Sequence, residues 1–192
     1  MREITDRALD TARARGASYA DVRVVRRREE SIDVKSGRLA GVLSHETEGF
    51  GVRVLVDGAW GFASSHRLAA GEADRVAARA VRIARASASA IRRPVVLDDR
   101  PPAQGRFETP VEEDPFAISL EQKVGDLLAA DEAMRRVEGI AFADTSYGAQ
   151  REEKTFAASD GSHTEQVTTH VGAAIEANAV DGDEHQRRSY PD

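Results

Sequence analysis

Hydrophobic residues return at helical spacing in the first stretch of the chain. In residues 2–15 the apolar side chains fall on one side of a helix, and Gly16 follows directly after them. Their positions are Ile4, Ala8, Leu9 and Ala12. This spacing is typical of an amphipathic helix, and a glycine just past the last turn is a common helix stop. We therefore expect a helix over residues 2–15.

The pattern then changes to the period of a β-strand. Valine and isoleucine alternate with charged or polar residues in 20–27 and in 31–37, and the second run ends in a Ser-Gly pair. Alternation of this kind predicts half-buried strands, and Ser-Gly is typical of a turn. Residues 39–43 predict a further short strand after that turn.

The clearest signal lies in residues 49–65. Two alternating runs flank Asp57-Gly58, a pair typical of a two-residue β-hairpin loop. The resulting register opposes Val56 with Ala59, Val54 with Gly61, Val52 with Ala63, Leu55 with Trp60, and Arg53 with Phe62. Both faces of the hairpin then carry apolar groups. We therefore expect this hairpin to lie centrally in a sheet that is covered on both sides.

Two further helices are expected, separated by a proline-rich segment. Residues 70–88 carry alanine and valine at helical spacing, and a short strand is expected over residues 95–97. Residues 98–115 contain four prolines among acidic residues, which predicts a loop or linker. A capping box at residues 119–122 predicts the start of the next helix, which should end near Val137.

The last part of the chain returns to strand patterns of unusual length. Strands are expected over residues 140–144 and 152–158, and a third follows the Asp160-Gly161 turn. Along this third strand, apolar residues from Val167 to Ala179 share one face. The other face carries the polar residues Gln166, Thr168, His170, Glu176 and Asn178. Such alternation predicts a half-buried antiparallel strand.

The chain is expected to reverse at Asp181-Gly182 and to pair Glu176 with Arg187. The returning strand has only begun at the last printed residue. Natural domains avoid leaving a long strand edge unpaired. We therefore expect the chain to be truncated relative to the functional protein; the alternative is a short closing edge strand, blunted by Pro191.

Together, these elements predict an α+β fold of mostly antiparallel sheets with about three packed helices, truncated before a C-terminal domain. We expect an N-terminal unit over residues 1–97 with the 49–65 hairpin at its centre. Residues 98–115 should form the linker. Residues 116–192 should form a helix followed by an antiparallel meander that is incomplete at its C-terminus.

Composition restricts the compartment and the partners. The 192 residues include no cysteine, which excludes disulfides and cysteine-ligated zinc within this chain and fits a reducing compartment. The net charge of −6 argues against a sequence-independent nucleic-acid binder, and Arg26–Arg28 are balanced at once by Glu29 and Glu30. No apolar run is long enough to cross a bilayer, and the charged N-terminus does not resemble a secretory signal. A cytoplasmic location without a membrane partner is expected.

Candidate chemistry is sparse. The five histidines do not form a helical zinc pattern: His45-Glu46 begins one, but positions 49 and 50 are glycine and phenylalanine. His163 and His170 are seven residues apart and fall on opposite faces of a strand. We therefore predict no catalytic residue, no metal ligand and no cofactor in this chain. The polar face of Gln166, Thr168, His170 and Glu176 either lines a substrate cavity or is a solvated sheet face.

Four segments, in the same order along the chain, resemble the N-terminal region of the TldD/PmbA family, once called modulators of DNA gyrase. They read YADVRVVRRREESIDVKSGRL, GFGVRVLVDGAWGFASS, VEEDPFAISLEQKVGDLLAADEAMRR and FAASDGSHTEQ. The resemblance covers almost the whole chain. It rests on the order of these segments, because none of them is a catalytic signature.

The resemblance implies a zinc metallopeptidase that acts on peptides or unfolded polypeptides. In a catalytic family member, zinc is expected in a C-terminal half that carries an H-E-x-x-x-H motif, and this sequence has no such motif. The family also implies a two-subunit assembly of paralogous chains, one catalytic and one not. Under this hypothesis the chain is a scaffold and peptide-guiding wall that is inactive alone.

Two other hypotheses stay open. The chain could be the N-terminal part of the non-catalytic, PmbA-like subunit, which a downstream H-E-x-x-x-H motif would exclude. It could also be a free-standing α+β interaction domain, for which the cellular protein would have a mass near 20.8 kDa.

Overall fold

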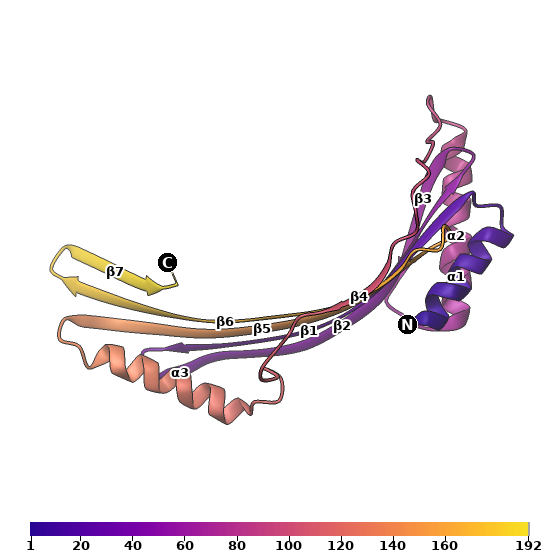
Figure 1. The fold of residues 1–192 in the computed structure, drawn as a ribbon. Coiled ribbons are helices and arrows are strands. Elements are labelled where there is room, and N and C mark those ends of the chain that lie inside the picture. The colour runs from indigo at the N-terminus through magenta and orange to yellow at the C-terminus, as the bar shows by residue number, and fades with distance from the viewer. Residues whose placement is uncertain (192) are drawn as a thin grey trace. The chain divides into compact units, whose positions relative to one another are not determined.

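The computed structural model describes residues 1–191, which form three helices and one seven-stranded sheet (Figure 1). The elements are α1 (Arg2–Ala14), β1 (Tyr19–Lys35), β2 (Arg38–Val56), β3 (Ala59–Ser65), α2 (Ala70–Ala88), β4 (Gln104–Glu108), α3 (Leu120–Arg135), β5 (Ile140–Ala158), β6 (His163–Asp181) and β7 (Glu184–Tyr190). The strand order is β3-β2-β1-β5-β6-β4, and β7 also pairs with β6. The expected α+β class with mostly antiparallel strands is confirmed.

The chain divides into two compact units, each built from three segments. Unit 1 comprises residues 1–27, 47–108 and 152–168. Unit 2 comprises residues 28–46, 109–151 and the described residues from Thr169 onward. This interleaving arises because β1, β2, β5 and β6 each contribute to both units. The predicted division of the chain at residues 98–115 refers to sequence order and stays a prediction.

Unit 1 is organised around valines covered by two helices. The α1 helix packs on α2, and α2 packs on β3 (Figure 1). Beneath the helices, the alternating residues of β1 and β2 are fully buried: Val22, Val24, Val52 and Val54. Gly61 allows this close packing, because a Cβ added there would lie 2.1 Å from the carbonyl oxygen of Ala80. Burial of regularly spaced aliphatic side chains is thus the main stabilising contribution in unit 1.

The predicted hairpin register is confirmed in all five pairs. Its expected central position is wrong, because β3 ends the strand order and has β2 as its partner. The expected cover on the second face is only partial: Leu55 is buried, whereas Phe62 is 58% exposed. The apolar groups there are shielded locally instead, since the guanidinium of Arg53 stacks 4.6 Å from the centre of the Trp60 ring.

Unit 2 has a smaller apolar core beneath α3. Ile32 and Val34 of β1 meet Leu127 of the helix, with Tyr147 of β5 packed against them. The predicted cap of this helix is confirmed, because the Ser119 hydroxyl accepts the Gln122 amide at 3.1 Å. This bond satisfies a helical N–H that would otherwise lack a partner.

The short strands expected over residues 20–27 and 31–37 are parts of the single strand β1, and those expected over 140–144 and 152–158 are parts of β5. Two further segments differ in the kind of structure they form. Residues 98–115, expected to be a loop, contain β4, whose residues are all exposed and pair in parallel with β6. Because no side chain of β4 is buried, no alternating pattern signals this strand. Residues 95–97, expected to be a strand, form none. The Val95 amide donates to the Gly58 carbonyl at 2.8 Å instead.

The β6–β7 hairpin forms with a register two residues away from the expected one. Glu176 lies opposite Ser189, and Arg187 lies opposite Asn178. The difference arises because the loop is Gly182-Asp183, one residue later than expected. The predicted attraction still occurs along the diagonal, where the Arg187 Nε atom lies 3.2 Å from a Glu176 oxygen.

Candidate functional site

The polar face of β6 supplies the side chains that the sequence marks as candidates. Gln166 and Thr168 belong to unit 1 and are half-buried. His170 and Glu176 belong to unit 2, where His170 is exposed and Glu176 is half-buried. Within unit 2, the period of a strand places His170 and Glu176 on the same face. Their role in guiding a substrate stays a prediction.

His170 lines a shallow hollow of about 530 Å³ in the sheet of unit 2. Residues from four strands surround this hollow, among them Glu29, Leu43, Gln150 and Gly172. Gly148 and Gly172 leave room, because a Cβ added at either would meet nothing within 4 Å. The main chain is therefore accessible here, and an extended ligand could approach the strands closely.

Glu176 lines a second hollow of about 510 Å³ in unit 2. Its wall carries three carboxylates and two cationic side chains, which form two ion pairs. Arg187 pairs with Glu176 at 3.2 Å, and the Lys35 ammonium lies 4.0 Å from Asp144. Asp33 also lines this hollow. The two hollows are distinct: His170 lines the first and Glu176 the second.

The outer edge of β6 is open beside the first hollow. In unit 2, β7 pairs with residues 175–181 of this edge. The Thr169 amide donates to the hydroxyl of Thr109 at 3.2 Å rather than to a strand. Between these points, residues 170–174 have no strand partner on this side within residues 1–191. Because alternate residues direct their main-chain groups to the same edge, Val171 and Ala173 follow Thr169 and present N–H and C=O groups there.

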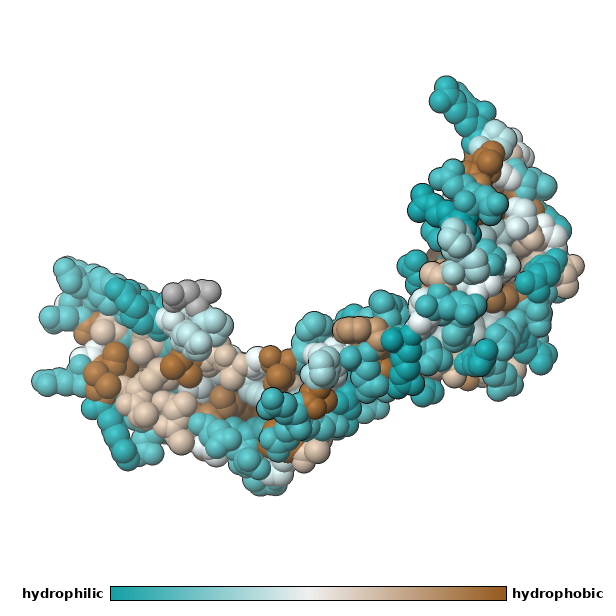
Figure 2. All heavy atoms as spheres, in the orientation of Figure 1, coloured by the Kyte–Doolittle hydropathy of each residue, from teal (hydrophilic) through white to brown (hydrophobic). Residues whose placement is uncertain are grey.

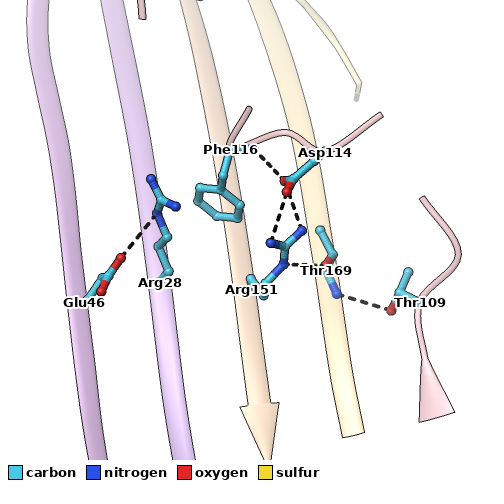
Figure 3. A network of polar contacts seen from close by, with 7 residues as sticks. All are labelled: Arg28, Glu46, Thr109, Asp114, Phe116, Arg151 and Thr169. Carbon is cyan, nitrogen blue, oxygen red and sulfur yellow. Dashed lines mark hydrogen bonds and ion pairs between the residues drawn. The ribbon is translucent and has the colours of Figure 1, made fainter. Parts of the chain in front are cut away.

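A polar network holds the segment before α3 against the sheet of unit 2 (Figure 3). The Arg151 guanidinium donates two hydrogen bonds to Asp114, at 3.0 and 3.2 Å, and a third to Thr169 at 3.3 Å. The guanidinium groups of Arg28 and Arg151 lie over the Phe116 ring, 4.6 and 5.3 Å from its centre, in cation–π contacts. The amide of Phe116 and the guanidinium of Arg151 both lower the pKa of Asp114. The arrangement is a structural clamp, since bidentate arginine–carboxylate pairs fix geometry.

Sequence reasoning missed this network. Asp114-Pro115 is a recognisable turn signal, and the Asp114 carboxylate accepts the Phe116 amide at 2.9 Å as such turns do. No local pattern predicts that Arg151, 37 residues away, supplies the second partner. Only the pairing of the strands places it there.

The arginine run of β1 is balanced by glutamates of the neighbouring strands β2 and β5, whereas Glu30, one of the two adjacent glutamates that the sequence suggested, pairs with Lys123. Arg26 lies 3.0 Å from Glu48 in unit 1, and Arg28 lies 3.5 Å from Glu46 in unit 2. Arg27 lies 2.7 Å from Glu152 and lowers its pKa. This neutralised cluster lacks the free positive charge that phosphate recognition requires.

The histidines do not fit a zinc centre. Within residues 1–191, no three His, Cys, Asp or Glu side chains come together in a way that could hold a metal ion. His45 contacts Glu29 at 3.0 Å, His163 contacts Glu165 at 3.4 Å, and His185 contacts Asn178 at 3.0 Å. Each is a pairwise contact, whereas zinc in proteins takes three or four such ligands. No step of a zinc-dependent reaction is therefore assigned to these residues.

Two protein-family models match the chain. Residues 20–84 match PmbA/TldA metallopeptidase domain 1, and residues 113–192 match the PmbA/TldA metallopeptidase central domain. The chain belongs to the PmbA/TldD metallopeptidase family. Domain 1 supplies most of the described helix-covered sheet of unit 1, and the central domain includes α3, β5, β6 and β7. The resemblance found in the sequence is confirmed.

Individual relatives agree with the family. A metalloprotease of Methanothermobacter thermautotrophicus is 29% identical over 164 residues, covering 85% of this chain and 35% of that protein. A candidate modulator of DNA gyrase from Bacteroides thetaiotaomicron has a similar fold, with a TM-score of 0.72 and 18% identity over 98% of this chain. TldE from Thermococcus kodakarensis has a TM-score of 0.67 with 13% identity over 97% of this chain.

The chain spans only part of these relatives. It covers about a third of the archaeal metalloprotease and 43% of each of the two solved chains. Among the helices of residues 1–191, none combines the length and apolar character needed to span a membrane.

Proposed function

We propose that this chain is the scaffold and peptide-guiding part of a TldD/PmbA-like zinc metallopeptidase that acts on peptides or unfolded polypeptides. The observation that carries this proposal is the open edge of β6 at residues 170–174, inside the region that matches the family's central domain. The edge adjoins a hollow with a glycine floor. An extended substrate needs these two features: main-chain partners and space.

The edge would hold a substrate by strand addition. Val171 and Ala173 would exchange main-chain hydrogen bonds with an extended peptide, whatever its side chains. Tolerance of this kind suits an enzyme that takes unfolded chains. His170 and Glu176, on one face of the same strand, would then contact alternate side chains of the substrate and give a modest preference.

Bond cleavage is assigned to residues beyond this chain. Zinc would supply a polarised water for attack on the peptide bond. The residues of this chain would present the substrate and would not hold the metal. A paralogous family member is the proposed source of a complete assembly, as the resemblance implies.

The proposal is tested by removing one main-chain donor from the edge. Ala173→Pro deletes an N–H that faces the open side, a position where proline is tolerated in an edge strand. We expect binding of a fluorescein-labelled, unstructured peptide to weaken by about tenfold, the worth of one hydrogen bond and a steric clash. Fluorescence anisotropy measures the dissociation constant, and Ala173→Ser, which keeps the donor, is the matched control.

Two results would contradict this function. Equal affinity of the Ala173→Pro and Ala173→Ser variants would exclude strand addition at this edge. Zinc-dependent hydrolysis of the same peptide by the purified 192-residue chain would exclude a purely guiding role.

A further inference from the structure

Unit 1 has a hollow on the face of its sheet that the helices leave open. The buried valines of β1 and β2, such as Val22 and Val52, lie beneath α1 and α2. Residues of the opposite parity on these strands face away from the helices, and they line a hollow of about 720 Å³. All of its lining residues belong to unit 1. Sites for small ligands typically have volumes of about 300 to 1,000 Å³, so this hollow is large enough to hold one.

Two glycines and an aromatic ring give the hollow an open floor and an apolar wall. Gly49 and Gly51 stand two apart on β2, so main chain takes the place of side chains on this part of the floor. The Phe62 ring lies next to the floor, because a Cβ added at Gly51 would be 2.8 Å from it. This ring is 58% exposed. An apolar group of modest size can therefore lie over the glycines against Phe62.

Three arginines line the hollow, and two of them are paired with carboxylates. Arg53 lies 2.7 Å from Asp21, and Arg27 lies 2.7 Å from a glutamate of β5. The Arg23 guanidinium instead lies over the Phe156 ring, 5.4 Å from its centre, and no carboxylate of residues 1–191 is within ion-pair distance of it. An aromatic ring attracts a cation but does not accept the in-plane N–H hydrogen bonds that a carboxylate accepts. Within the described chain, Arg23 is thus a cation of the hollow without an anionic partner.

These features specify a carboxylate attached to an apolar group. The guanidinium of Arg23 matches the two oxygens of a carboxylate. Ser64 shares a face of β3 with Phe62 and lines the hollow, and its hydroxyl is a further donor of this kind. A purely apolar ligand would leave the arginine unused. The last residue of a peptide carries an α-carboxylate and a side chain on the same carbon, so it presents both groups together.

We propose that this hollow binds the C-terminal residue of a peptide, with its carboxylate on Arg23 and its side chain against Phe62. The choice of a peptide as the occupant rests on the proposed function, but the site lies in unit 1 and uses no residue of the β6 edge. Loops of a folded protein have no free α-carboxylate. A site of this kind therefore distinguishes a chain end from an internal segment, which main-chain pairing at a strand edge does not.

A matched pair of peptides tests the carboxylate. Both are unstructured, carry fluorescein at the N-terminus and end in leucine, and one has a free C-terminal carboxylate where the other has a carboxamide. We expect fluorescence anisotropy to show about tenfold tighter binding of the acid, as a charge-assisted hydrogen bond in contact with solvent allows. Arg23→Gln should bring the affinity for the acid down to that for the amide. Arg82→Gln removes an exposed arginine of α2 outside the hollow and is the control.

A second variant tests the apolar wall. Phe62→Ala should weaken binding of the leucine-terminated acid by about fivefold, and binding of a glycine-terminated acid by less than about twofold. Leu97→Ala, at a 43% exposed site of unit 1 outside the hollow, is the matched control. Equal losses for the two peptides would show that the terminal side chain does not contact Phe62.

Two further measurements decide between this occupant and others. A carboxamide peptide with glutamate as its last but one residue should bind as weakly as the plain amide. If it bound as tightly as the free acid, the hollow would accept any carboxylate, and the assignment to chain ends would be wrong. The acid and the amide are also compared with the natural protein at its full length. Equal affinity there would show that another segment of polypeptide occupies the hollow, which would overturn the proposal.

The two proposals can fail independently. Ala173→Pro, at the β6 edge, should weaken binding of the acid and the amide alike. Arg23→Gln should weaken binding of the acid alone. A preference for the acid that survives Arg23→Gln would exclude this hollow as the site without affecting strand addition at β6. A natural chain that binds the acid and the amide equally would have no site for chain ends at all.

Discussion

Unit 1 and unit 2 share four strands but are stabilised differently. In unit 1, two helices cover the sheet, and side chains such as Val22, Val54 and Ala80 are fully buried. In unit 2, a single helix covers the sheet, and the buried cluster reduces to Ile32, Val34 and Leu127. The same strands therefore pass from a region with a continuous aliphatic core to one with little of it. Free energy from apolar burial is correspondingly smaller in unit 2.

Polar contacts replace apolar burial in unit 2. The Lys123 ammonium pairs with Glu30 while only 4% of the lysine side chain is exposed. Arg151 and Asp114 fasten the segment that precedes α3. Large apolar side chains stay at the surface, as Figure 2 shows for the visible face of the part around β5 and β6. They include Phe142, Val171, Ile175 and Val180.

Exposed apolar residues and open strand edges indicate where a partner could bind. Unit 1 buries most of its aliphatic residues internally, although it too exposes large apolar side chains such as Phe62 and Val96. A unit with exposed apolar residues and open strand edges gains stability when a ligand or another chain covers them. The open edges at residues 38–46 and 170–174 belong to unit 2, and the outer edges of β3 and β4, at the two ends of the strand order, belong to unit 1. The smaller apolar core of unit 2 is the observation that distinguishes it from unit 1 and that favours it as the interacting part in the proposed function.

The largest expected effect comes from disrupting the close packing of unit 1. Gly61→Val introduces a side chain where Ala80 and Ala84 leave no room, the nearest atom being a main-chain oxygen 2.1 Å from the new Cβ. Overpacking typically costs about 1 to 3 kcal/mol, and a clash with a helix backbone belongs at or above the top of that range. The free energy of unfolding of unit 1 should fall by about 3 kcal/mol or more. Trp60, the only tryptophan, reports unit 1 in a urea titration.

Gly105→Val is the matched control, because a Cβ at Gly105 meets nothing within 4 Å. It should change the stability of unit 1 by less than about 0.5 kcal/mol, as exposed substitutions do. If Gly61→Val were as stable as this control, α2 could move away from β3 without loss. The account of unit 1 as a closely packed core would then be wrong.

A smaller effect is expected from the buried ion pair of unit 2. Lys123→Ala leaves the Glu30 carboxylate, 14% exposed, without its partner. Unpaired buried charges cost about 3 to 5 kcal/mol, and the partial exposure of Glu30 reduces this to about 2 to 3 kcal/mol. Hydrogen exchange of peptides from β1 and α3 should show the loss. The Trp60 signal of unit 1 should change little.

The double variant Glu30→Leu with Lys123→Leu separates charge from packing. Replacing both partners by leucine enlarges the apolar cluster around Leu127 and removes the cost of burying two charges. Hydrogen exchange should return to the natural level or become slower. If the double variant were as unstable as Lys123→Ala, the ion pair would stabilise unit 2 more than two leucines at the same positions. Unit 2 would then need this polar contact for its stability.

Sequence patterns predict several local features of the two units, but they do not predict which strands are neighbours in the sheet. The register of the 49–65 hairpin is predictable because Asp57-Gly58 selects one loop length. The cap of α3 is predictable because Ser119 and Gln122 stand three apart. The edge position of β3 is not predictable, since Arg53 and Trp60 shield its open face as a covering layer would. Local patterns thus give elements and registers, whereas neighbours in the sheet come from tertiary structure.

For the candidate site too, the sequence predicts the local features but not those that depend on strand pairing. His170 and Glu176 share a face because β-strands have a period of two, and the sequence predicts this. The hollow beside His170 also requires Leu43 and Gly148, from strands distant in sequence. The open edges are hidden from the sequence as well, because they depend on how far β3 and β7 extend along their partners. Only the edge at residues 38–46 carries a signal that could have been noticed, the uncharged run of residues 39–43.

The smallest expected effect concerns the clamp of unit 2 and its pH dependence. In the folded protein, the Phe116 amide and Arg151 hold the pKa of Asp114 below its unfolded value. A depressed folded pKa means that the stabilisation is fully present above the unfolded value, about 3.9, and is lost as the pH falls through the lower folded value. Asp114→Asn keeps the acceptor for Phe116 but removes the charge. We expect a loss of about 0.5 to 1 kcal/mol at neutral pH, reduced by solvent because the side chain is 42% exposed.

Hydrogen exchange of residues 109–119, corrected for intrinsic rates, measures this loss at pH 7 and at decreasing pH below about 3.9. The natural chain and Asp114→Asn should differ at pH 7 and converge as the pH falls through the folded pKa of Asp114, because protonation also removes the charge. Asp98→Asn is the control, since the Asp98 carboxylate is 83% exposed and pairs only with a neighbouring arginine. A difference between the chain and Asp114→Asn that persisted at low pH would mean that the clamp acts through shape and not through charge. Unit 2, like unit 1, would then be stabilised at this point by packing and not by charge.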